Sequence, residues 1–120
     1  MIWPISLCDR AFLAKLDEIS FPCVILGRTE ERDADTSWVD INNTQAGVLA
    51  TRHLVQRGYR RIAFVSHSGK ETFNADRISG YCRELDASGL GVYQSLIIHA
   101  APGIDNDVAL ISALLRSAGR

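Results

Sequence analysis

Short apolar runs and amphipathic periods alternate along this chain of 120 residues, and this alternation restricts its possible folds more than any other feature. The apolar runs are typical of strands, and they fall at residues 23–26, 38–41, 61–65 and 95–99. Between them, apolar residues recur at three- and four-residue steps, which predicts helices over about 6–19, 43–57, 73–87 and 105–115. This order predicts an α/β fold with an open, largely parallel sheet flanked by helices.

Local signals predict where the second and third helices begin, end and pack. Asn42-Asn43 can cap the second helix through a side-chain oxygen, and Gly58 stands where a left-handed C-cap is needed. The expected buried face of this helix carries Ala46, Leu49, Ala50, His53 and Leu54. The third helix is expected to pack closely at Gly80 and to bury Ile78, Cys82 and Leu85.

Composition excludes several classes of function. The net charge is −1 and the pI is about 6.3, so the chain has no general attraction to nucleic acid or acidic membranes. No apolar stretch approaches the ~18 residues of a membrane helix. The three cysteines form no CxxC pair and the three histidines lack metal-ligand spacing, so we expect reduced thiols and no metal site.

The usual signatures of catalysis are missing from the sequence. No GxGxxG motif follows a strand, and neither a GxxxxGK[ST] loop nor a GxSxG elbow is present. Ser66-His67 places a serine beside a histidine, but neighbours in sequence do not make a catalytic triad. We therefore expect no enzyme activity and no cofactor.

One edge of the predicted sheet is where a ligand is expected. In open parallel sheets, ligands bind beyond the carboxyl ends of the strands. The segments that follow the predicted strands at this edge are residues 27–28, 66–73 and 100–103.

Three stretches of the sequence carry motifs that, taken together and in this order, are typical of a single protein family. Residues 39–65 read VDINNTQAGVLATRHLVQRGYRRIAFV, with FPCVILGR upstream at 21–28 and NADRISGY downstream at 74–81. These resemble the LacI/GalR repressors, whose patterns are V-x-x-D-N-x-x-A-G-x-x-A-T-x-H-L-x-x-x-G-H-R-x-I-A-F-I, I-P-V-V-L-I-G/D-R and A-x-x-R-x-x-G-F. The chain departs from the family at Asn42, Tyr59 and Gly27, where aspartate, histidine and often aspartate are usual.

The resemblance implies part of a two-lobed, periplasmic-binding-protein-like fold of type I, which closes on an effector between its lobes. By this analogy, residues 1–40 form the later part of the N-terminal lobe, and residues 41–120 the first part of the C-terminal lobe. Met1-Ile2-Trp3-Pro4 looks like the end of a strand with none before it, so we expect a segment of a larger protein. A cytoplasmic homodimer that binds operator DNA through a helix-turn-helix absent from this chain is also implied.

The resemblance further implies which residues contact the effector. Arg77 matches the family's effector-binding arginine, and its fork can bind vicinal hydroxyls, a carboxylate or a phosphate. The alternative for Arg77 is a surface ion pair with Asp76 or Glu84. Phe73 can stack on a sugar face or belong to the core of its helix. The full set of candidates lies at strand ends, at the crossover between lobes and near Arg77: Trp3, Gly27, Arg28, Ile41, Glu71, Phe73 and Arg77.

Three functions remain open at this point. The first is the effector-sensing region of a LacI-type repressor, which binds a small molecule, a sugar or sugar derivative, in the cleft between the lobes. The second is a periplasmic or receptor-type sugar-binding protein without DNA binding. The third, a small α/β enzyme, requires a site around Ser66-His67. The stretch GYRRIAFV at residues 58–65 favours the repressor.

Overall fold

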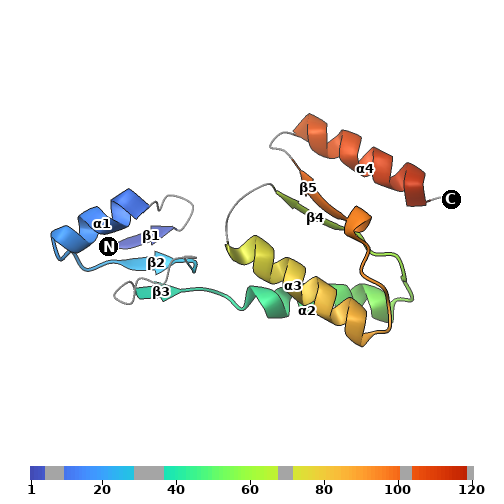
Figure 1. Ribbon diagram of the computed structural model, residues 1–120, viewed down its shortest axis with the longest axis horizontal. Coiled ribbons are helices and arrows are strands. Elements are labelled where there is room, and N and C mark those ends of the chain that lie inside the picture. Colours follow the sequence, from blue (N-terminus) through green and yellow to red (C-terminus); the bar gives the residue numbers. More distant parts are fainter. Residues whose placement is uncertain (5–9, 29–36, 68–71, 101–103, 119–120) are drawn as a thin grey trace.

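Two separate parallel sheets organise the chain in the computed structural model (Figure 1). The first sheet has three strands and the second has two, and every neighbouring pair of strands is parallel. The α/β class predicted from the alternation of apolar patterns is therefore confirmed. The structure describes residues 1–4, 10–28, 37–67, 72–100 and 104–118.

The strands are short, and helices or loops connect them in chain order. The first sheet consists of β1 (Ile2–Pro4), β2 (Val24–Leu26) and β3 (Ser37–Val39), with β2 in the middle. The second sheet pairs β4 (Phe64–His67) with β5 (Ile97–Ala100).

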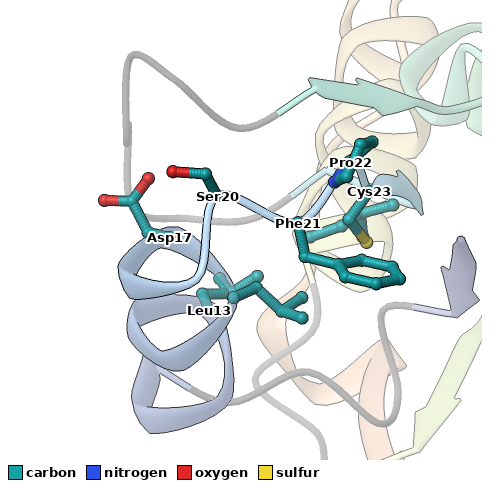
Figure 2. A pocket seen from close by; sticks show the side chains of 8 residues that line it. Leu13, Asp17, Ser20, Phe21, Pro22 and Cys23 are labelled. Atoms are coloured by element: carbon teal, nitrogen blue, oxygen red, sulfur yellow. The ribbon is translucent and has the colours of Figure 1, made fainter.

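One face of the first sheet is covered by α1 (Arg10–Glu18). Ile25, at the centre of β2, is fully buried on that face, whereas Leu26 is exposed on the other. Leu13 and Leu16 of α1 and Ile25 are among the residues that line a pocket of about 270 Å³, whose lining side chains are drawn in Figure 2. The predicted start of this helix near Ser6 lies outside the described residues.

The second sheet lies between two layers of helices (Figure 1). On one side, α2 (Asn43–Gln56) and α3 (Thr72–Ala87) lie next to each other, and on the other α4 (Ile104–Ala118) packs against β5. The core under α3 consists of Ile62, Tyr81 and Leu85. The rings of Tyr81 and Phe64 meet there with centroids 5.5 Å apart, so α3 is joined to β4 by aromatic packing.

Both ends of α2 follow the predicted capping signals. Asn42 is the N-cap, and its side-chain oxygen accepts a hydrogen bond from the Gln45 N–H at 3.0 Å. At the other end, Gly58 has a φ of +90°, a left-handed conformation that glycine adopts without steric cost. Asn43 is the first residue of the helix, so its side chain is available for contacts outside α2.

The predicted buried face of α2 is wrong. Leu49, Ala50, His53 and Leu54 are exposed, and the buried residues are Asn43, Gly47, Val48 and Thr51. The closeness of the two helices is the physical reason. Gly47 lies against the backbone of α3 at Arg77, and Gly80 lies against the backbone of α2 at Thr44. The distance between two packed helices depends on the side chains at the contact, and helices this close leave no room for leucine. The expectation that Gly80 allows close packing is confirmed.

The second sheet begins later in the chain than predicted. β4 starts at Phe64 rather than Arg61, because its partner β5 starts only at Ile97, after a 3₁₀ turn at Gln94–Leu96. Residues 61–63 therefore have no opposing strand in the described part of the chain. Ser66 and His67, which were expected in a loop, extend β4 and pair with His99 and Ala100.

A bidentate ion pair joins α2 to α3 one turn beyond the glycine contact. Arg52 donates through Nε and Nη2 to the two carboxylate oxygens of Glu84, at 3.0 and 2.9 Å. Glu84 itself is buried. The hydrogen bonds from Arg52 hold the pKa of Glu84 below its ordinary value, although burial opposes the shift.

We predict that the stability contributed by this ion pair is lost at acid pH. The pKa of Glu84 is lower in the folded protein than in the unfolded chain, where it is about 4.5. The contribution is therefore present above that value and disappears as the pH falls through the folded pKa. Glu84→Gln should lower the midpoint of thermal unfolding clearly at neutral pH, and much less near pH ~3.

The matched control for this prediction is Glu18→Gln, in the exposed pair that Glu18 forms with Lys15. Exposed ion pairs contribute little, so this variant should shift the unfolding midpoint only slightly at either pH. If Glu84→Gln lowered the midpoint equally at both pH values, the ion pair would not be the source of the effect.

Candidate functional site

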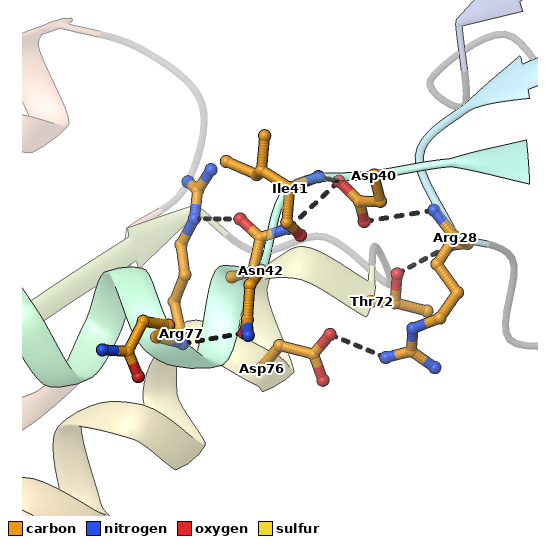
Figure 3. Close-up of polar contacts among 9 residues, drawn as sticks. Arg28, Asp40, Ile41, Asn42, Thr72, Asp76 and Arg77 are labelled. Atoms are coloured by element: carbon orange, nitrogen blue, oxygen red, sulfur yellow. Dashed lines mark hydrogen bonds and ion pairs between the residues drawn. The ribbon is translucent and has the colours of Figure 1, made fainter.

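Six polar side chains gather where the first sheet meets the N-terminal ends of α2 and α3, and we call this cluster the polar junction (Figure 3). Two of them follow strands of the first sheet, one opens α2, and three belong to the first two turns of α3. In chain order they are Arg28, Asp40, Asn43, Thr72, Asp76 and Arg77.

A relay of three hydrogen bonds runs through the polar junction from β2 to α3 (Figure 3). The Arg28 backbone N–H donates to Asp40 Oδ2 at 3.2 Å. Asn43 Nδ2 donates to the other oxygen of Asp40 at 3.2 Å, and Arg77 Nε donates to Asn43 Oδ1 at 2.9 Å. Asn43 is only 3% exposed, so the hydrogen bond that orients Arg77 is shielded from water.

The carboxylate of Asp40 also explains why β3 ends at Val39, two residues earlier than expected. Its Oδ1 accepts a hydrogen bond from the Ile41 N–H at 2.8 Å, in addition to the one from Asn43. This local turn takes the chain out of the strand after Val39 and leads it directly into α2. Asp40 thus links the end of the first sheet to the helix pair.

A second connection joins β2 directly to α3. Arg28 Nη2 forms an ion pair with Asp76 Oδ2 at 2.7 Å, and the hydroxyl of the buried Thr72 donates to the Arg28 carbonyl oxygen at 2.6 Å. Arg28 therefore contacts α3 with both its backbone and its side chain. With the relay, these contacts hold the first sheet against the start of α3 on two sides.

Arg77 is oriented by its neighbours but not neutralised by a carboxylate among the described residues. Asp76 pairs with Arg28 and Glu84 pairs with Arg52, so neither forms the surface ion pair considered for Arg77. The guanidinium carbon lies 5.0 Å from the centroid of the Phe73 ring, a cation–π contact. Nε is bound to Asn43, whereas the two terminal nitrogens have no partner in the described part of the chain.

The other described candidates for effector contact lie in or directly beside the first sheet. Gly27 follows β2 with a φ of +115°, and its N–H donates to the Val39 carbonyl at 2.8 Å, so its backbone completes the first sheet. Ile41 lies between β3 and α2 with its side chain 66% exposed. Trp3 lies in β1 opposite Ile25 in the parallel register. Glu71 lies outside the described residues.

Sequence reasoning named Arg28, Phe73 and Arg77 but did not select the residues that connect them. The sequence suggests capping as the main role of Asn43, but Asn42 is the cap, and the Asn43 side chain binds Asp40 and Arg77 instead. Asp40 carried a detectable signal as well, because it is a carboxylate directly after an apolar run. Thr72 carried none, since a threonine at the start of a helix is common.

Several other kinds of site are absent from the described part of the chain. No group of three or more His, Cys, Asp or Glu side chains there could hold a metal ion. Cys23 and Cys82 are free thiols, and burial raises the pKa of Cys82, which disfavours the reactive thiolate. The described helices include none that is long and apolar enough to cross a membrane.

The comparison with known proteins agrees with this architecture. Parallel sheets flanked by helices, joined through a polar junction, place the chain in the fold class of periplasmic-binding-protein-like domains. The chain belongs to the family of periplasmic binding proteins and sugar-binding domains of the LacI family, which residues 8–118 match. The resemblance to the LacI/GalR repressors is thereby confirmed.

Individual relatives are transcriptional regulators. The maltose regulon regulatory protein MalI of Escherichia coli strain K12 is 30% identical over 100 residues, which cover 83% of this chain and 29% of MalI. The HTH-type transcriptional regulator AglR of Rhizobium meliloti strain 1021 is 36% identical over 86 residues, 72% of this chain and 24% of AglR. Among solved structures, the complex of the transcriptional regulator CelR with cellobiose has a TM-score of 0.83 at 29% identity, and covers 98% of this chain and 36% of that one. The chain thus spans 24–29% of the length of these two relatives.

Proposed function

We propose that this chain is the effector-sensing region of a LacI-type DNA-binding transcriptional repressor, and that the effector is a sugar or sugar derivative. The family match and the naming of MalI, AglR and CelR as regulators support the regulatory part. The presence of cellobiose in the CelR structure supports a sugar. Since the relatives are named as regulators rather than enzymes, we propose no catalytic activity around Ser66-His67.

The state of Arg77 is the observation that carries the ligand proposal. A guanidinium that is half-buried, held at Nε and packed on an aromatic ring has already lost most of its conformational freedom. Its two terminal nitrogens can then donate parallel hydrogen bonds to vicinal hydroxyls at little further entropic cost. In this arrangement Phe73 supports the arginine, and Asn43 acts as the positioning residue.

We further propose that residues 1–40 and 41–120 belong to two lobes that close on the effector. The two separate sheets and the extended connection through Ile41 support this division. Closure would change the population of conformations that bind operator DNA, through a helix-turn-helix outside this chain. By analogy with the family, the protein is a cytoplasmic homodimer.

Isothermal titration calorimetry of the full-length protein tests the proposal. The ligand panel comprises monosaccharides, cellobiose, maltose, sugar phosphates and nucleobases. One compound is expected to bind saturably, and Arg77→Ala should weaken that binding more than about tenfold, or ~1.4 kcal/mol. Arg77→Lys keeps the positive charge but lacks the guanidinium fork, so this variant should also bind the effector more weakly.

Arg83→Ala is the matched control, because Arg83 lies on the same helix, is exposed and takes no part in the polar junction. It should leave the affinity unchanged. Binding that survives Arg77→Ala would overturn the site assignment. Ligand binding by a full-length protein that has no affinity for operator DNA would instead support the receptor-type sugar-binding alternative.

A further inference from the structure

A second cavity lies beyond the C-terminal ends of α2 and α3, which are the ends opposite the polar junction. Its volume is about 490 Å³, within the range of small-molecule sites. The length of α2, 14 residues, separates the two places by about 21 Å at 1.5 Å per residue. The cavity is lined by the segment after α2 and the loop after α3, through Arg60, Arg61, Gly89, Leu90, Gly91, Tyr93 and Ser95.

The loop after α3 gives this cavity a defined wall. Gly89 has a φ of +70°, and the Leu90 N–H donates to the Leu85 carbonyl at 2.8 Å, which turns the chain back toward the second sheet. At Gly91 a Cβ atom would lie 3.3 Å from the Tyr93 ring, so the absence of a side chain at Gly91 lets the ring lie close to this position. Tyr93 is nevertheless 56% exposed, and part of its surface is open to a ligand.

The polar groups of the cavity are dominated by hydrogen-bond donors and positive charge. Arg60 and Arg61 are both exposed, and neither has an ion pair among the residues that the structure describes. No aspartate or glutamate is among the lining residues. Because Arg60 and Arg61 both line the cavity, an anion bound there would meet two positive charges. Phosphate is an anion whose oxygens match the arginine fork.

We propose that this cavity is a second ligand site, distinct from the polar junction, which binds a phosphate-bearing small molecule. Arg60 and Arg61 contact the phosphate group, Ser95 of the cavity wall donates a hydrogen bond from its hydroxyl, and the remainder of the molecule packs against the Tyr93 ring. A ligand here would touch the ends of α2 and α3, the same two helices whose other ends hold Asn43 and Arg77.

Calorimetric titration of the full-length protein with inorganic pyrophosphate at low ionic strength tests this site. The double variant Arg60→Gln/Arg61→Gln should bind pyrophosphate more than about tenfold more weakly. The control Arg57→Gln/Arg83→Gln removes the same charge from exposed positions that do not line the cavity, and should bind within about twofold of the unchanged protein. Arg77→Ala should also leave pyrophosphate binding intact, which separates this site from the proposed effector site.

Three results would overturn the proposal: no saturable binding up to roughly 10 mM, equal losses in the cavity and control variants, or loss of binding in Arg77→Ala. Thermal unfolding checks that each variant is folded. If the double variant does not fold, the single variants Arg60→Gln and Arg61→Gln replace it, and each should still bind several-fold more weakly than Arg57→Gln. As a second probe, phenyl phosphate should bind more tightly than inorganic phosphate, and Tyr93→Ala should abolish that difference.

Discussion

Alanine at Gly80 or Gly47 is expected to lower the free energy of unfolding by about 2–3 kcal/mol, although alanine stabilises an ordinary helix by up to ~1 kcal/mol over glycine. The added methyl has no space. At Gly80 it would overlap the Thr44 carbonyl oxygen, and at Gly47 the Arg77 carbonyl oxygen. Both obstacles are backbone atoms of a neighbouring helix, so α2 and α3 would have to separate to make room.

Chemical denaturation of the full-length protein measures this effect, and two controls show its origin. Ser79→Ala, next to Gly80 on the exposed side of α3, should change the free energy of unfolding by less than ~0.5 kcal/mol. Gly58→Ala has no atom within 4 Å of the new Cβ and should cost only the strain of its positive φ, about 1 kcal/mol. If Gly80→Ala stabilised the protein as in an open helix, the close contact between α2 and α3 would be disproved.

The helix contact also bears on the effector site. The carbonyl that Gly47 touches belongs to Arg77, and the opposing residue at Gly80, Thr44, follows Asn43 directly. Separation of the helices would therefore lengthen the hydrogen bond between Asn43 and Arg77. For this reason, Gly47→Ala should weaken effector binding in addition to lowering the free energy of unfolding.

Removal of the Tyr81 side chain is the second change with a large expected effect. Tyr81 is 1% exposed and contacts Ile62, Leu85 and Phe64 in the core beneath α3. Tyr81→Ala leaves a cavity the size of an aromatic ring and should cost about 3–5 kcal/mol. The hydroxyl donates to the Ile62 carbonyl at 2.6 Å, so Tyr81→Phe leaves that buried oxygen unpaired and should cost about 1–2 kcal/mol.

The two Tyr81 variants separate packing from hydrogen bonding in one unfolding experiment. Tyr59→Ala serves as the control, because Tyr59 is 58% exposed and lies beyond the end of α2; its cost should be below ~0.5 kcal/mol. A Tyr81→Phe variant as stable as the unchanged protein would mean that water reaches the Ile62 carbonyl. If Tyr81→Ala lowered the free energy of unfolding only slightly, the core under α3 would have to rearrange to fill the space of the missing ring.

Local sequence signals anticipated the order of elements and the ends of α2. Apolar periodicity follows directly from helix and strand geometry, so it is readable before folding. The cap at Asn42 and the left-handed Gly58 are equally local, because each depends on backbone groups a few residues away. The α/β class and the family motifs can therefore be recognised from local patterns in the sequence.

The buried face of α2 could not be read in the same way. The periodicity of Leu49 and Leu54 assumes that a helix buries its largest apolar residues, yet α2 packs through Gly47 instead. A glycine in a helix is compatible with either solvent exposure or close packing. The choice depends on whether a second helix with its own glycine lies opposite, as Gly80 does.

The contacts of the candidate site show the same division. The chemical types were evident along the chain: an arginine in Arg-x-x-Gly, an arginine after a strand, a pair of asparagines before a helix. Their partners were not, because Arg28 pairs with Asp76 across 48 residues and Arg77 with Asn43 across 34. Local periods and caps arise from forces within a few residues, and they settle which elements form. The pairing of charges depends on distances that are set only when the two sheets and the helix pair come together. The same distances decide which guanidinium retains nitrogens without a hydrogen-bond partner.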